Sequence, residues 1–233
     1  MSGEEIVRKY LDEGLVALLP VYRGGVEGTE VFTLSQTYQL YHSISWSLEL
    51  LARYCCIDLQ SLRRYSRRFL EVRHHIPLPF SRGLVLLPVK VRDGVGLGET
   101  TVGFVNYLQI EGLEGAVSTG AGAAGLDRIV SETPGALTQR CGGGGEKCRS
   151  HILCRGSVVI RCMNTVSTVK TKLRQGELLC NEMTKRQQLL AVEEKGQRGL
   201  SGAALRQLLP ACDCLLRDIM LLLLDRIPAG AEK

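Results

Sequence analysis

Residues 55–81 read CCIDLQSLRRYSRRFLEVRHHIPLPFS, a basic segment that runs directly into an apolar one. The basic part carries five arginines and two histidines within thirteen residues, and its only acid is Glu71. Neighbouring cations repel one another unless an anion lies opposite, and the backbone of a nucleic acid is the obvious candidate. A solvent-exposed helix face is the alternative, because most charge runs lie at the surface. The cations are Arg63, Arg64, Arg67, Arg68, Arg73, His74 and His75.

The same stretch predicts a helix followed by a strand. Residues 60–70 form the helix, and its four arginines, at i, i+1, i+4 and i+5, lie along one side. The chain then enters a strand in the apolar run 76–80. An earlier helix is expected at 46–56, because apolar residues recur there with helical spacing, and Ser45 or Ser47 can cap its first turn.

Runs rich in β-branched residues, separated by glycine and proline, predict the remaining strands. They are expected at 15–22, 29–34, 38–43, 84–91 and 101–110, and a hairpin at 151–163 turns at Arg155-Gly156. A short amphipathic helix or arm is expected at 1–12. A further helix is expected after Asn164, up to about residue 188, and Gly176 interrupts its apolar positions. These patterns predict an α+β fold with a mixed or antiparallel sheet, packed helices and a helical C-terminus.

The domain organisation expected is one domain with an appendage. Residues 1–190 form the domain, with an insertion at about 112–149 in which ten of 38 residues are glycine. A segment this rich in glycine buries little apolar surface, which cannot offset the entropy lost when the segment is ordered. A flexible loop is therefore predicted. Residues 191–233 form a linker and an apolar helix, continuous over 200–227 or broken at Pro210. That helix either closes the core or dimerises.

The composition is typical of a soluble globular protein. Of the 233 residues, 45% are hydrophobic and 23% are charged, and the net charge of +5 permits a polyanionic partner without requiring one. The first ten residues lack the basic and apolar regions of a signal peptide, and the apolar run at 220–224 is too short to span a bilayer. The expected location is the cytoplasm, where the nine cysteines are reduced core thiols rather than a disulfide framework.

Four residues could form a tetrahedral zinc site, because Cys141, Cys148, His151 and Cys154 supply three thiolates and an imidazole. However, no Cys-x-x-Cys pair occurs, and in a strand His151 and Cys154 would point to opposite faces, so no metal is expected. The GGGGEK run at 142–147 lacks the Gly-Lys-Ser/Thr of a phosphate loop. No nucleophile and base have a catalytic spacing, so the sequence predicts neither an enzyme nor a cofactor.

Four blocks, in this order along the chain, resemble the ComK family, the competence transcription factors of Gram-positive bacteria. They are GLVALLP at 14–20, SLELLARYCC at 47–56, HHIPLPFSRGLVLLPV at 74–89, and the hairpin with its following helix at 150–179. Arg155-Gly156 stands where the family usually has Asn-Gly. The chain departs from the family pattern at Arg63-Arg64, which replaces a Gly-Arg pair, and at 98–107, where GETTVGFVNY replaces a Cys-x-Trp-Ile block.

The resemblance implies a DNA-binding transcriptional activator that binds A/T-rich duplex DNA through the minor groove and acts as a homo-oligomer. A narrow A-tract minor groove attracts arginine, and the planar guanidinium matches phosphate geometry. No membrane or small-molecule substrate is expected as a partner. The expected DNA-binding residues are Arg63, Arg64, Arg67, Arg68 and Arg73, with Lys170, Lys172 and Arg174 on the helix after the hairpin.

Two other functions stay open at this point. The departures from the family pattern fit a regulatory protein that keeps the ComK-like fold, has lost DNA binding and acts through protein partners. A metal- or redox-sensing protein that uses Cys141, Cys148 and Cys154 is the third hypothesis.

Overall fold

The structure is a computed structural model that describes residues 3–23, 26–94, 99–116 and 148–196. The chain divides into two compact units, Met1–Met183 and Thr184–Lys233. The predicted helix at 200–227 and most of the glycine-rich insertion lie outside the described residues.

The described elements include four α-helices and nine strands. The helices are α1 (Gly3–Asp12), α2 (Ile44–Tyr54), α3 (Leu59–Leu70) and α5 (Val166–Gly196). The strands are β1 (Leu15–Arg23), β2 (Val26–Thr33), β3 (Thr37–Leu40), β4 (Leu78–Ser81), β5 (Leu84–Lys90), β6 (Val102–Asn106), β7 (Ile110–Gly115), β8 (Ser150–Cys154) and β9 (Val158–Cys162). The predicted α+β class is therefore confirmed.

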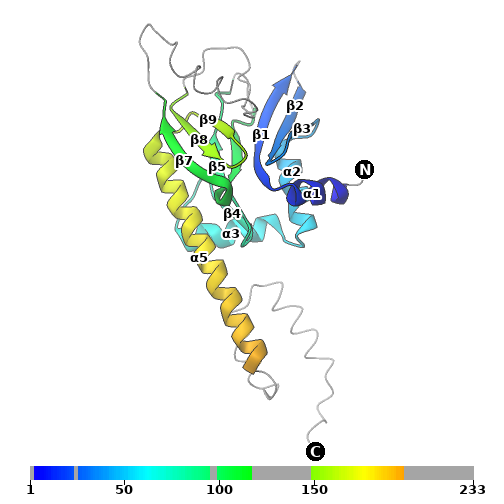
Figure 1. The fold of residues 1–233 in the computed structure, drawn as a ribbon, viewed down its shortest axis with the longest axis vertical. Helices are drawn as coiled ribbons and strands as arrows, with labels where there is room; N and C mark the ends of the chain where they lie inside the picture. Colours follow the sequence, from blue (N-terminus) through cyan, green and yellow to red (C-terminus); the bar gives the residue numbers. More distant parts are fainter. Residues whose placement is uncertain (1–2, 24–25, 95–98, 117–147, 197–233) are drawn as a thin grey trace, which may run out of the picture. The chain divides into compact units, whose positions relative to one another are not determined.

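Two antiparallel sheets organise the first unit (Figure 1). Six strands form the larger sheet in the order β3-β2-β1-β6-β5-β4, and three form the smaller sheet in the order β7-β8-β9. Every strand pair in both sheets is antiparallel. Of the two alternatives left by the sequence, a mixed or an antiparallel sheet, the structure has the second.

The larger sheet carries a core on each face. On one face, Val7 of α1 and Leu48 of α2 pack against Leu18 of β1. On the other face, Phe32 of β2 shares a core with Ile152 of the smaller sheet, and the start of α5 adds to it. The result is a layer of helices, a six-stranded sheet, and a third layer made by the smaller sheet and α5 (Figure 1).

β1 explains why the sequence has an unbroken apolar run at 15–20. The strand is central, and it is buried on both faces. Leu18 points to the helix layer, whereas Ala17 and Leu19 belong to the core with the smaller sheet. A β-bulge between Leu15 and Ala17 shifts the register, so Val16 and Ala17 contribute to the same core.

Two predicted boundaries in the middle of the chain are wrong. The strand expected at 101–110 ends at Asn106, because the Asn106 side chain accepts a hydrogen bond from the Leu108 backbone N–H at 3.3 Å and starts a 3₁₀ turn. β7 then occupies the first four residues of the predicted insertion, 112–115. Gly112 lies opposite Leu153 of β8, and a β-carbon there would meet the Leu153 side chain at 3.2 Å. This glycine therefore belongs to a strand rather than to a loop.

The ends and interior of two helices also differ from expectation. Ser43, rather than Ser45 or Ser47, caps α2, and its side chain accepts a hydrogen bond from the Trp46 backbone N–H at 3.3 Å. Ser47 is buried in the helix instead. α5 passes through Gly176 without interruption, because the missing side chain lets the helix approach the side chains below it.

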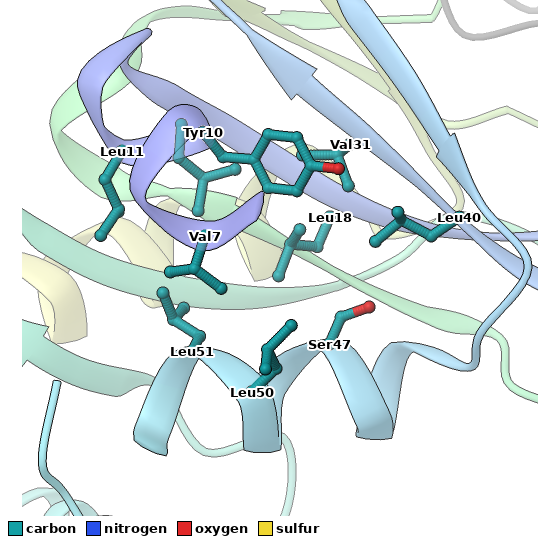
Figure 2. A pocket seen from close by; sticks show the side chains of 10 residues that line it. Val7, Tyr10, Leu11, Leu18, Val31, Leu40, Ser47, Leu50 and Leu51 are labelled. Atoms are coloured by element: carbon teal, nitrogen blue, oxygen red, sulfur yellow. The ribbon is translucent and has the colours of Figure 1, made fainter. Parts of the chain in front are cut away.

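A small apolar cavity lies where α1 and α2 meet the larger sheet (Figure 2). Its volume is about 20 Å³. That is close to the space of a single water molecule, and the walls are almost entirely apolar. We interpret it as a packing void of the core and not as a ligand site. The lining residues are Val7, Tyr10, Leu11, Leu15, Leu18, Val31, Leu40, Ser47, Leu50 and Leu51.

Candidate nucleic-acid interface

α3 carries the arginine cluster, and local interactions define both of its ends. Asp58 caps the first turn, and its carboxylate accepts a hydrogen bond from the Ser61 backbone N–H at 2.6 Å. The helix stops at Glu71, whose φ of 55° lies in the left-handed region. Leu59 and Leu62 are buried against the body of the protein. The opposite face of the helix is therefore left to the charged side chains.

The arginines of α3 form one outward face. Arg64, Arg67 and Arg68 are exposed, and Arg63, at the margin of that face, is half-buried. Arg73, in the segment after the helix, is exposed as well. We call Arg64, Arg67 and Arg68 the arginine face.

No carboxylate lies within salt-bridge distance of the arginine face in the described part of the chain. The ion pairs found there involve other residues. Arg64 donates a hydrogen bond to the hydroxyl of Ser61 at 3.0 Å. Hydrogen bonds from Ser61 lower the pKa of the helix-capping Asp58, and the charge of Arg64 helps to lower it further. Unpaired arginines at this density raise the local positive potential, which favours an anionic partner.

The second predicted basic set does not form one surface. Lys170 and Arg174 are exposed, whereas Lys172 is only 7% exposed. Residues two apart on a helix point in nearly opposite directions, so the spacing of these three residues divides them between two faces. Burial lowers the pKa of Lys172. The structure therefore separates Lys172 from the other predicted DNA-binding residues.

His75 connects the two basic helices. It lies in the segment between α3 and β4, and burial lowers its pKa, with further lowering from the charges of Lys172 and His74. Sequence reasoning treated His74 and His75 as the end of the basic tract and did not anticipate a lysine from α5 beside them. Nothing in the local sequence around His75 indicates that contact, because the two segments are about a hundred residues apart.

Of the cysteine and histidine residues considered for zinc, Cys148 and His151 come together in the described residues, whereas Cys154 lies apart from them. β8 places His151 and Cys154 on opposite faces, as expected for a strand. The sulfur of Cys148 lies 3.5 Å from Nε2 of His151. Cys154 is instead buried in the core, where burial raises the pKa of its thiol to about 12. Cys141 lies outside the described residues, and among those described no three potential ligands come together.

Comparison with protein-family models, with curated proteins and with solved structures returned no match to this chain. Among the helices that the structure describes, none combines the length and apolar character needed to cross a bilayer.

Proposed function

We propose that this chain binds double-stranded DNA, with a preference for A/T-rich sequence, and acts as a transcriptional activator of the competence-factor type. The observation that carries the proposal is the arginine face of α3. It presents three exposed guanidinium groups, and none of them forms a salt bridge with a carboxylate among the described residues. The resemblance of four sequence blocks to the ComK family supports the transcriptional role.

The dimensions of a helix and of DNA suggest how α3 would bind. An α-helix with its side chains is about 10–12 Å wide, whereas the minor groove is about 6 Å wide. The helix itself cannot enter that groove, but single arginine side chains can. α3 would therefore lie over the backbone, with some guanidinium groups on phosphates and others inserted where A/T-rich sequence narrows the groove.

Other basic residues would add phosphate contacts at the margin of the interface. Arg73 is exposed close to α3 in the chain, and Lys170 and Arg174 are exposed on α5. Lys172 leaves the proposed set because it is buried. The family resemblance also implies binding as a homo-oligomer, which the stoichiometry of the titration below would report.

The test is binding of the full chain to an A/T-rich and a G/C-rich duplex of equal length, each over a series of salt concentrations. We expect tighter binding to the A/T-rich duplex and a linear fall of log K with log salt, because phosphate neutralisation releases counterions. Substituting Arg64, Arg67 and Arg68 together by Gln should reduce the magnitude of the salt slope by roughly 2 to 3, because each lost phosphate contact removes about 0.9.

The control removes the same charge elsewhere. Arg8, Arg149 and Arg155 are exposed outside α3, and their joint substitution by Gln lowers the net charge equally. This variant should keep most of the affinity and the preference for A/T-rich sequence. If both triple variants lose binding to the same extent, DNA binding depends only on net charge, and the proposed interface on α3 is wrong. No binding to either duplex at low salt would favour a regulatory protein that acts through protein partners.

A further inference from the structure

An open cavity of about 280 Å³ lies beside the arginine face, on the helix-covered side of the larger sheet. Residues from α2, α3, the segment before β4, and strands β4, β5 and β6 meet there. Its volume approaches that of the smaller ligand pockets in proteins. The lining residues are Ile44, Ser45, Leu48, Arg63, His75, Ile76, Leu78, Pro88, Thr100, Val102 and Phe104.

The cavity is lined mainly by apolar side chains and by one charged side chain, that of Arg63. Leu48, Leu78 and Phe104 give it hydrocarbon walls. Arg63 is the one side chain of permanent charge in the described lining, and no carboxylate of the described residues lies within ion-pair distance of it. A half-buried guanidinium without a partner, next to apolar walls, leaves a strong hydrogen-bond donor unused.

Other hydrogen-bonding groups line the same cavity. Ser45 lines the cavity from the first turn of α2, where backbone N–H groups have no partner within the helix and attract negative charge. Thr100 and His75 supply a hydroxyl and an imidazole. Arg63 supplies the one permanent positive charge of the described lining, which matches a monoanion better than a phosphate dianion.

We propose that this cavity binds a small organic carboxylate with a hydrocarbon body, with Arg63 holding the carboxylate and the apolar walls holding the chain. The guanidinium fork accepts a carboxylate in a bidentate arrangement. The inference does not rest on DNA binding, because it uses only the residues that line the cavity. It also gives Arg63 a role that differs from that of the arginine face.

The test is isothermal titration calorimetry of the full chain with octanoate, with octan-1-ol and with inorganic phosphate, in the absence of DNA. Octanoate carries both the anionic head and the hydrocarbon body, whereas each of the other probes carries one of them. We expect octanoate to bind saturably, at concentrations below about 10 mM. We expect the alcohol and inorganic phosphate to bind at least about 10-fold more weakly, because a charge-assisted hydrogen bond or the apolar contact is missing.

Variants locate the binding site. Arg63→Gln should weaken octanoate binding by about 10- to 100-fold, which is the loss typical of a hydrogen-bonded charge. Arg67→Gln is the matched control, because Arg67 lies on the same helix but outside the cavity, and octanoate should bind it as it binds the wild type. Ser45→Phe fills the cavity and leaves the guanidinium in place, so it should also weaken octanoate binding.

Several results would overturn the proposal. If octanoate does not bind to the wild type, the cavity is not a carboxylate site. If octanoate and octan-1-ol bind equally well, the charge of Arg63 does not contribute to binding. Equal loss in Arg63→Gln and Arg67→Gln would show a non-specific charge effect. An unchanged thermal transition in each variant shows that the fold is retained. Because no DNA is present, failure here leaves the proposed function untouched, and failure of DNA binding leaves this inference untouched.

Discussion

The two basic helices, α3 and α5, present their cations in opposite ways. On α3 the four arginines occur at i, i+1, i+4 and i+5, which confines them to an arc of about 140°. On α5 the three cations occur at i, i+2 and i+4, so Lys172 points about 200° away from Lys170. Equal density of charge in the sequence thus gives one continuous surface on α3 and a divided set on α5.

The helices also differ in what lies beneath them. α3 packs through Leu59 and Leu62 and leaves one side to solvent. α5 packs closely against the sheet, where Val169 and Leu179 are buried and Gly176 adjoins Leu87. A cation on the buried side of α5 is therefore removed from water, whereas the cations of α3 remain hydrated. The comparison shows that the position of a basic residue on its helix decides whether its charge is exposed to solvent and to a partner or is buried in the protein.

The largest expected effect concerns the packing side of α5. A β-carbon at Gly176 would lie 3.0 Å from side-chain atoms of Leu87 and Tyr107, so Gly176→Val should destabilise the fold by about 2–3 kcal/mol through overpacking. Urea denaturation measures the free energy of unfolding. Leu178→Val is the control, because Leu178 is 53% exposed on the same helix, and it should cost less than about 1 kcal/mol. Equal costs would mean that α5 does not pack closely at Gly176.

A smaller effect is expected at the buried lysine. Lys172→Met keeps the apolar stem and removes a charge with no ion pair in the described residues, so it should raise the free energy of unfolding at pH 7 by about 1 kcal/mol. Lys170→Met, at an exposed position, should change it by less than about 0.5 kcal/mol. A loss of stability in Lys172→Met alone would indicate that the ammonium group has a stabilising partner.

The pH dependence of stability gives a second measurement on Lys172. Burial lowers its pKa in the folded state below the usual value of 10.5, so between those two pKa values the unfolded state binds more protons. Stability contributed by this group therefore rises as pH increases through that window. Subtracting the pH profile of Lys172→Met from that of the wild type should isolate this rise. A flat difference would mean that the lysine titrates alike in the folded and unfolded states.

The smallest expected effect on stability is on α3. Joint substitution of Arg64, Arg67 and Arg68 by Gln removes only exposed side chains and should shift the free energy of unfolding by less than about 0.5 kcal/mol in total. Differential scanning calorimetry of the variant used for DNA binding provides the measurement. A large loss of stability would mean that these arginines hold the fold together, and the comparison between α3 and α5 would no longer stand.

Local pattern predicted much of the fold, and its failures have identifiable causes. The helix at 60–70 and the hairpin turning at Arg155-Gly156 were predicted from periodicity and turn chemistry, and both are present. β7 was missed because Gly112 reads as a loop residue until Leu153 is placed opposite it. Gly176 interrupts the apolar positions of the expected helix, and its close packing against Leu87 cannot be read from the neighbouring sequence.

The arginine face is a property of the sequence by itself. Four arginines at i, i+1, i+4 and i+5 lie on one side of any helix they form, because 3.6 residues per turn sets their directions. Only the tertiary structure decided that Lys172 is buried beside His75 and that Arg63 lines a cavity. Those neighbours come from segments far apart in the chain, and the packing of the sheet against its helices brings them together.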